Sequence, residues 1–133
     1  MKITEYALSL NVADPEASAK FLIDHFGFEV RMSAEEFVSL SRPEGGLNVI
    51  YLRTGLSSFK PERIADSAGQ GTLVVFVVED IDAEYERVQR EGVPIETPIE
   101  TEPWGERYFQ MRDPNGIVVQ LVQWVTVPAG AES

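Results

Sequence analysis

The chain has 133 residues, of which 44% are hydrophobic, and its 11 basic and 22 acidic residues give a formal charge of −11. A chain of this size can bury one good core, and the absence of cysteine excludes disulfides, thiolate metal sites and cysteine nucleophiles. The charge disfavours nucleic acid and no apolar run could cross a bilayer, so we expect a cytoplasmic protein without nucleic-acid or membrane partners.

The first half of the chain predicts one helix among four strands. A strand-like run leads to Asp14, a good N-cap, and Pro15 fits the first helical position. Apolar residues at helical spacing follow, and Gly27 can end the helix in a left-handed conformation. The strand-like runs are 3–12, 28–33, 36–42 and 47–53. The predicted order is therefore β-α-β-β-β.

The second half repeats this order after a connection at 55–70. Asp80 corresponds to Asp14 as the N-cap of the second predicted helix, and Gly92 corresponds to Gly27 at its C-terminal end. The strand-like runs are 71–78, 93–99, 106–112 and 116–125. We predict an α+β fold in which two tandem βαβββ modules, 1–54 and 71–127, form a single domain over 1–127. Residues 128–133 are expected to be a flexible tail.

Four motifs stand out in the chain. They are the run from Asn11 to Ser18, the pair Gly27-Phe28, the run from Pro103 to Arg107, and the run from Arg112 to Gly116. Together they resemble the vicinal oxygen chelate superfamily, which contains glyoxalase I, extradiol dioxygenases and bleomycin resistance proteins. The resemblance covers residues 3 to 125. It implies paired modules whose mixed sheets curl into cups, and a homodimer for a chain this short.

The resemblance also implies where a metal ion would be held. Enzymes of this superfamily bind a divalent metal through His, Glu or Gln side chains on the first and last strands of the modules. Counting from the capping aspartates and the turn glycines places Ala7, Ile50, Leu73 and Gln120 at these positions. Only Gln120 offers a donor atom, and stable transition-metal sites need three or four protein ligands. We therefore expect no metal.

One alternative keeps a metal. A shift of two residues leaves each side chain on the same face of its strand and brings Glu5 and Asn48 to the metal positions beside Gln120. These three oxygen donors would suit magnesium better than zinc.

The remaining candidates for a functional site are side chains that could line the cups. On the first strand Ser9 alternates with residues expected to face the helix, whereas the fifth strand is apolar on both faces. The aromatic residues near strand ends could stack on a flat or cationic molecule beside Glu102 and Glu106, although ordinary packing also explains them. The predicted ligand-binding residues are Gln120, Trp104, Tyr108, Leu73, Ser9, Glu5, Ile50 and Phe37.

Three functions are compatible with these observations. The favoured one resembles the metal-free bleomycin resistance branch, in which a homodimer sequesters an apolar or cationic drug or metabolite in a groove without chemistry. The first alternative is a metal-dependent lyase, isomerase or dioxygenase with displaced ligands. The second is a scaffold or regulatory module that no longer binds a ligand, because a fold does not determine a function. Whether the chain is an enzyme stays open, with no catalytic residue proposed.

Overall fold

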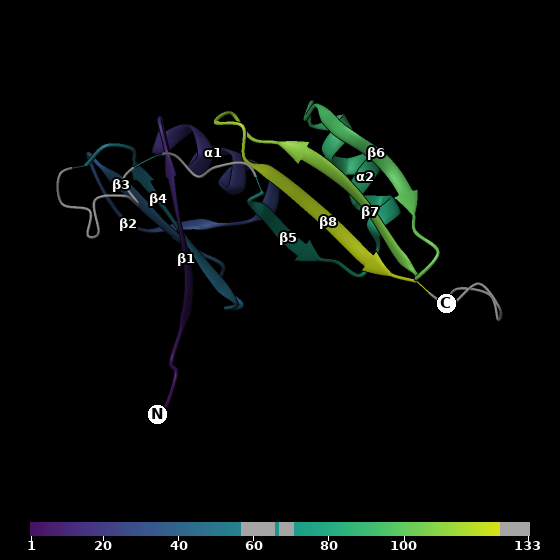
Figure 1. The fold of residues 1–133 in the computed structure, drawn as a ribbon, viewed down its shortest axis with the longest axis horizontal. Helices are drawn as coiled ribbons and strands as arrows, with labels where there is room; N and C mark the ends of the chain where they lie inside the picture. The colour runs from purple at the N-terminus through teal and green to yellow at the C-terminus, as the bar shows by residue number, and fades with distance from the viewer. Residues whose placement is uncertain (57–65, 67–70, 126–133) are drawn as a thin grey trace. The chain divides into compact units, whose positions relative to one another are not determined.

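The computed structural model describes residues 1–56, 66 and 71–125. Most of the predicted connection at 55–70 and the predicted tail at 128–133 lie outside these residues. The chain divides into two compact units, Met1–Gly71 and Thr72–Ser133. Each unit contains one helix and one four-stranded mixed sheet, so the predicted α+β fold with two βαβββ modules is confirmed (Figure 1).

The sheet of the first unit has the strand order β1-β4-β3-β2. Its central strand β4 pairs with β1 in parallel and with β3 antiparallel, while β2 pairs antiparallel with β3. The elements are β1 (Tyr6–Val12), α1 (Pro15–Phe26), β2 (Glu29–Ala34), β3 (Phe37–Ser41) and β4 (Leu47–Arg53). Strands β1 and β2 therefore form the two edges of the sheet.

The second unit repeats this topology with the strand order β5-β8-β7-β6. Strand β8 pairs with β5 in parallel and with β7 antiparallel. The elements are β5 (Leu73–Val77), α2 (Ile81–Arg90), β6 (Ile95–Thr101), β7 (Glu106–Arg112) and β8 (Val118–Trp124).

Both helices begin at the predicted aspartates. The Asp14 side chain accepts a hydrogen bond from the backbone N–H of Ala17 at 3.2 Å, and Asp80 accepts one from Ala83 at 3.1 Å. Helix α1 ends at Gly27, whose φ of 71° lies in the left-handed region that glycine tolerates best. These caps satisfy helix-end groups and separate each helix from the strand before it.

Strands β6 and β8 begin later than predicted, because backbone N–H groups before them donate to the end of a helix or to a turn. Strand β6 begins at Ile95 rather than at residue 93, because the N–H of Val93 donates to the carbonyl of Val88 at the end of α2. Strand β8 begins at Val118 rather than at residue 116, because the N–H of Ile117 donates to the Asp113 carboxylate in the preceding turn.

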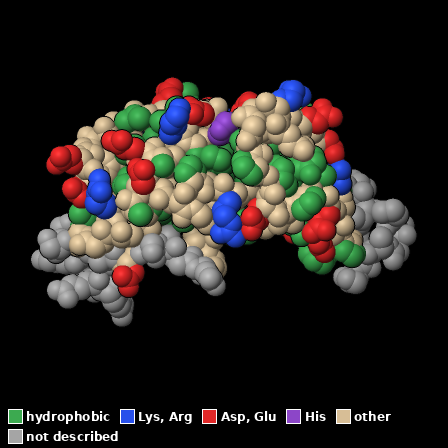
Figure 2. Space-filling view, turned by 90° about the horizontal axis from the view of Figure 1, so that it is seen from above, with side chains coloured by type: hydrophobic (Ala, Val, Ile, Leu, Met, Phe, Trp, Pro, Cys, Tyr) green, Lys and Arg blue, Asp and Glu red, His purple; other side chains and the backbone are tan. Residues whose placement is uncertain are grey.

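Each unit buries one face of its sheet against its helix. In the first unit Leu22 of α1 and Val49 of β4 are fully buried, and in the second Ile81 of α2 and Val119 of β8 are fully buried. The opposite face of each sheet carries the candidate site residues. Acidic side chains outnumber Lys and Arg on the face in view in Figure 2. Among the described residues, neither helix is long and apolar enough to span a membrane.

Candidate functional site

The open face of the first sheet lies opposite α1 and is built by alternation along the strands. On β1, Leu10 and Val12 are buried toward the helix, whereas Ala7 and Ser9 are exposed on the other face. The register pairs Ala7 with Asn48 and Ser9 with Ile50 on β4. Side chains of registered partners project to the same face, so this row forms the floor of the open face.

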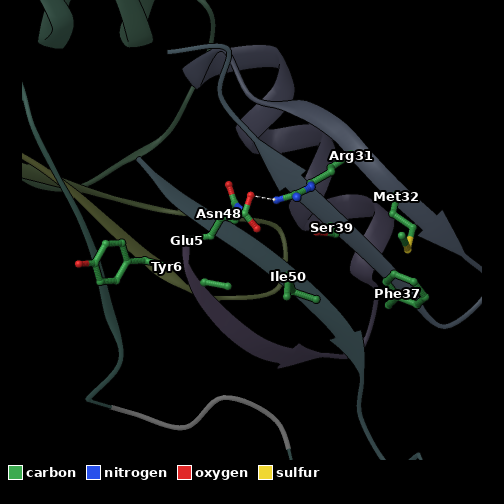
Figure 3. Close-up of a pocket in the computed structure, with 9 residues that line it drawn as sticks. Glu5, Tyr6, Arg31, Met32, Phe37, Ser39, Asn48 and Ile50 are labelled. Carbon is green, nitrogen blue, oxygen red and sulfur yellow. Dashed lines mark ion pairs between the residues drawn. The ribbon is translucent and has the colours of Figure 1, made fainter. Parts of the chain in front are cut away.

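This face holds a cavity of about 490 Å³, a volume within the usual range for small-molecule sites. Figure 3 shows its lining, with Glu5, Arg31 and Asn48 gathered at one end and Ile50, Met32 and Phe37 toward the other. Tyr6 projects away from the other labelled side chains in this view. The lining residues are Glu5, Tyr6, Ala7, Arg31, Met32, Phe37, Ser39, Asn48 and Ile50.

An ion pair connects the two edges of the first sheet across this cavity. The guanidinium of Arg31 on β2 lies 2.8 Å from the carboxylate of Glu5, which immediately precedes β1 (Figure 3). In a flat sheet, edge strands separated by three spacings would lie about 14 Å apart. The sheet curls and the long arginine side chain spans the remaining gap. We call this pair the Glu5–Arg31 strap.

A β-bulge in β2 places the arginine of the strap. Val30 pairs with Leu40 and Met32 with Ser39, so Arg31 is an extra residue without a cross-strand partner in the register. Bulges bend a strand and re-aim the side chain at the irregularity. Here the bulge gives the cavity both the Arg31 guanidinium and the Met32 thioether.

Asn48 is the buried polar group of the cavity. Its side chain is on the cavity lining and the residue is only 9% exposed. Among the described residues the structure gives its carboxamide no hydrogen-bond partner, and its registered neighbour Ala7 has none to offer. The amide group is therefore directed at the cavity rather than used to hold the sheet together.

The open face of the second sheet is different, because its polar groups are paired with one another. The hydroxyl of Thr97 donates to Gln110 at 2.8 Å, Gln110 donates to Gln120 at 2.8 Å, and Gln120 donates to Glu106 at 3.5 Å. Gln120 is 6% exposed. This chain of hydrogen bonds runs across three strands and uses the amide oxygens of both glutamines.

The apolar row beside this chain is uncovered in the structure. Leu73, Val75 and Val77 project from the edge strand β5 with exposures of 42%, 44% and 68%. The sequence predicted a strand apolar on both faces, and the face that carries these three residues is exposed within its unit. The buried residue of the strand is Val74, at 3%.

The predicted aromatic residues of the second unit lie near the hairpin between β6 and β7. Trp104 is 59% exposed in the turn. The hydroxyl of Tyr108 lies 2.7 Å from Glu100 and 3.1 Å from Glu102. The hydrogen bond to the Glu100 carboxylate, together with burial of the phenol and the second carboxylate, raises the pKa of Tyr108 well above its ordinary value. This phenol is therefore a donor, and a poor base, at neutral pH.

The structure thus separates the predicted site residues into two groups. Glu5, Phe37 and Ile50 line the cavity of the first unit, while Ser9 lies on the same face outside the lining. The other four predicted residues, Leu73, Trp104, Tyr108 and Gln120, belong to the second unit.

The sequence prediction missed Arg31, Met32 and Ser39 as cavity residues. No simple pattern marks the bulge, because strict alternation along 28–33 places neighbouring residues on opposite faces. The opposite charges of Glu5 and Arg31 are visible in the sequence, but their pairing depends on how far the sheet curls.

The described residues at the positions implied by the superfamily do not fit a metal ion. Ala7 and Ile50 carry no donor atom, and the carboxylate of Glu5 is already paired with Arg31. The amide oxygen of Gln120 accepts a hydrogen bond from Gln110. Within residues 1–56, 66 and 71–125, no group of three His, Cys, Asp or Glu side chains is arranged to bind a metal.

Comparisons with solved structures identify the same fold. A glyoxalase/bleomycin resistance protein/dioxygenase from Nocardioides is 22% identical, with a TM-score of 0.78 over 96% of this chain and 87% of its own. Lactoylglutathione lyase from Agrobacterium tumefaciens is 20% identical, with a TM-score of 0.74 over 92% of this chain and 94% of its own. TioX from Micromonospora sp. ML1 is 24% identical, with a TM-score of 0.68 over 92% of this chain and 100% of its own.

A search of curated proteins gave no match. The family model, in contrast, covers nearly all of both units, since it matches residues 3–121. This extent, together with the two βαβββ modules, decides the family. The chain belongs to the Glyoxalase/Bleomycin resistance protein/Dioxygenase superfamily.

Proposed function

We propose that this chain is a small-molecule binding protein that holds its ligand in the cavity of the first unit without a metal ion. The observation that carries the proposal is the cavity of about 490 Å³ on the open face of the first sheet, lined at the implied metal positions by Ala7 and Ile50. A binding role needs room for a ligand, and the volume of this cavity supports it. A metal-dependent reaction needs donors that these two side chains lack.

The cavity also distinguishes binding from a purely structural role. A scaffold that had lost its ligand would be expected to fill the cup with its own side chains, since interiors are packed to high density. Here Ala7 and Ser39 contribute small side chains to the lining of a cavity of about 490 Å³. The space supports the retention of a ligand.

The lining favours an uncharged ligand with an apolar body and a polar end. Ile50, Phe37 and Met32 provide apolar contact, and Phe37 provides an aromatic ring for stacking. A cationic ligand would need a free carboxylate, but Glu5 is paired with Arg31 and the strap is close to neutral. The sequence left apolar and cationic ligands open, and the strap favours the first.

A thermal-shift screen of neutral aromatic compounds tests this proposal. A true ligand at one hundred times its dissociation constant should raise the free energy of unfolding by about 2.7 kcal/mol. Ala7→Phe should abolish the shift by filling the floor of the cavity. Ser9→Phe is the matched control, because Ser9 is two residues along the same face and outside the lining.

Metal analysis of protein purified without a chelator tests the absence of a resident ion. We expect manganese, iron, nickel, zinc and magnesium all to be far below one equivalent per chain. One equivalent of any of them would overturn the metal-free proposal.

In the thermal-shift screen, ligand-induced shifts that persist in Ala7→Phe would mean that the ligand binds outside this cavity.

A further inference from the structure

We propose that Asn48 selects ligands that carry a planar hydrogen-bond donor beside an acceptor, as in a lactam, an imide or a primary amide. This inference rests on the proposed function, because it names the chemical class that the same cavity would take. Its basis is a buried carboxamide that faces the cavity and has no partner among the described residues.

The burial of Asn48 makes this group unusual in the chain. The residue is 9% exposed, and buried polar side chains nearly always have a hydrogen-bond partner. The carboxamide atoms of Asn48 are not fully enclosed and face the cavity. The other buried carboxamide, Gln120, follows the rule, with partners on its amide nitrogen and oxygen. Since the registered neighbour of Asn48 on β1 is Ala7, which has no polar side chain, the carboxamide is open to the contents of the cavity.

In solution a polar group that faces a cavity is hydrated, and a ligand that binds there has to replace that water. A ligand that displaces ordered water without reproducing its hydrogen bonds loses affinity. An apolar molecule would therefore leave the amide N–H and C=O unsatisfied, at a cost similar to that of a buried polar group without a partner. The cavity favours molecules that offer replacements.

The geometry of a carboxamide specifies which replacements work. Its N–H and C=O lie side by side in one plane, so a single molecule satisfies both when it presents C=O and N–H in the same arrangement. A carboxylate has no proton to donate, and the formal charge of −11 disfavours anions. An ammonium group has no acceptor. A neutral amide edge meets both requirements.

The rest of the lining fits the remainder of such a ligand. The side chains of Ile50, Phe37 and Met32 surround the cavity away from Asn48 and offer only apolar contact (Figure 3). A flat aromatic ring fused to a lactam would place its amide edge on Asn48 and its ring against Phe37. The cavity therefore points to an aromatic lactam as a probe.

The test compares isoquinolin-1(2H)-one with its N-methyl derivative, which has the same ring but no N–H. Each is titrated into the ¹⁵N-labelled full-length chain, and amide chemical shifts report both affinity and location. We expect the lactam to move the resonances of Ala7, Ile50 and the Asn48 side-chain NH₂, and to bind at least about tenfold more tightly than the methylated compound.

Two variants complete the test by asking whether the difference depends on Asn48. In Asn48→Leu, which keeps the number and branching of the side-chain heavy atoms, both compounds should bind with equal affinity, because the group that tells them apart is gone. Asn48→Asp keeps an acceptor but loses the donor, so it should weaken lactam binding. Preserved spectral dispersion of each variant establishes that it folds.

The outcomes separate this inference from the proposed function. If both compounds bind the wild-type cavity equally, or if Asn48→Leu keeps the preference, the role of Asn48 is overturned while the cavity remains a binding site. If neither compound moves any resonance of the lining, the inference is overturned. The screen that compares Ala7→Phe with Ser9→Phe then decides separately whether the cavity binds other ligands.

Discussion

Two buried carboxamides, Asn48 and Gln120, have opposite roles in the structure. Gln120 is held in a chain of hydrogen bonds that reaches Thr97, Gln110 and Glu106. Asn48 faces a cavity and has no such chain among the described residues. A group that the protein satisfies internally contributes to stability, whereas one left to solvent and ligand contributes to recognition.

Replacing each amide with leucine should therefore affect stability differently. Gln120→Leu leaves the amide of Gln110 without its acceptor in a buried setting and should lower the free energy of unfolding by about 1–2 kcal/mol. Asn48→Leu removes no internal hydrogen bond and should change it by less than about 0.5 kcal/mol. Urea denaturation of the two variants measures both. A loss above about 1 kcal/mol in Asn48→Leu would show that its amide has a structural partner.

Sequence reasoning identified both residues but could not tell their roles apart. Counting along the strands brought Gln120 and, with a shift of two residues, Asn48 to positions on the open faces. The amide oxygen of Gln120 is satisfied from the neighbouring strand, because β7 and β8 pair so that Gln110 lies opposite Gln120. Such cross-strand pairs depend on the register, which the sequence leaves open.

Local signals in the sequence predicted the helices and strands well. Asp14 and Asp80 cap both helices as expected, and Gly27 ends α1 in the left-handed conformation. These signals act within a few residues, so they can be read without the fold. The bulge at Arg31 could not be read in this way, because it is a property of the pairing between β2 and β3.

Because the Glu5–Arg31 strap joins the edges of the sheet over the cavity, it should control how fast a ligand enters and leaves. The two side chains are 55% and 46% exposed, so the pair contributes little to stability and opens easily. In Glu5→Ala both the association and the dissociation rates of a cavity ligand should rise by about three- to tenfold, with a smaller change in affinity. Stopped-flow fluorescence of the wild-type chain and of Glu5→Ala, each mixed with an aromatic ligand of the cavity, measures these rates.

A matched control for the strap is available on the same sheet. Arg53 and Glu36 form an ion pair at 3.2 Å with similar exposure, 50% and 47%, and neither residue lines the cavity. Glu36→Ala should leave both ligand rates unchanged. If Glu5→Ala changed only the dissociation rate, the strap would contact the ligand rather than gate its passage.

A second ion pair should make the stability of the second unit depend on pH. Arg107 of β7 contacts Asp82 of α2 at 2.6 Å and 3.2 Å, and this hydrogen bonding lowers the pKa of Asp82. A carboxyl group whose pKa is lower in the folded state stabilises the fold above its unfolded pKa, about 3.9, and loses this contribution as the pH falls through the folded pKa.

Asp82→Asn should accordingly lower the free energy of unfolding by about 0.5 kcal/mol near pH 7, a small value because the aspartate is largely exposed. The difference from wild type should shrink in acid and vanish once the pH is below the lowered pKa of Asp82 in the folded state. Asp24→Asn, which removes one charge from a local helix pair, controls for the change in net charge. An Asp82→Asn effect of equal size at both pH values would mean that packing, not charge, is lost.

At the scale of the whole molecule, high charge and an exposed apolar strand act against each other. The formal charge of −11 makes copies of the chain repel one another. Yet β5 is an edge strand without a charged residue, and its exposed row of Leu73, Val75 and Val77 is a surface of the kind that proteins usually cover or protect. The homodimer expected from the family would cover this row with a second copy.

We therefore predict that the wild-type chain is a dimer at micromolar concentration and that Val77→Lys, at the most exposed position of the row, shifts it toward monomer. Val30→Lys is the matched control, since Val30 is also a valine on an edge strand and is 53% exposed. Because both copies carry the same negative charge, added salt should screen their repulsion and tighten the wild-type dimer. Sedimentation equilibrium at low and high salt measures both effects. A wild-type monomer under all conditions, or equal dissociation of the two variants, would contradict an interface at β5.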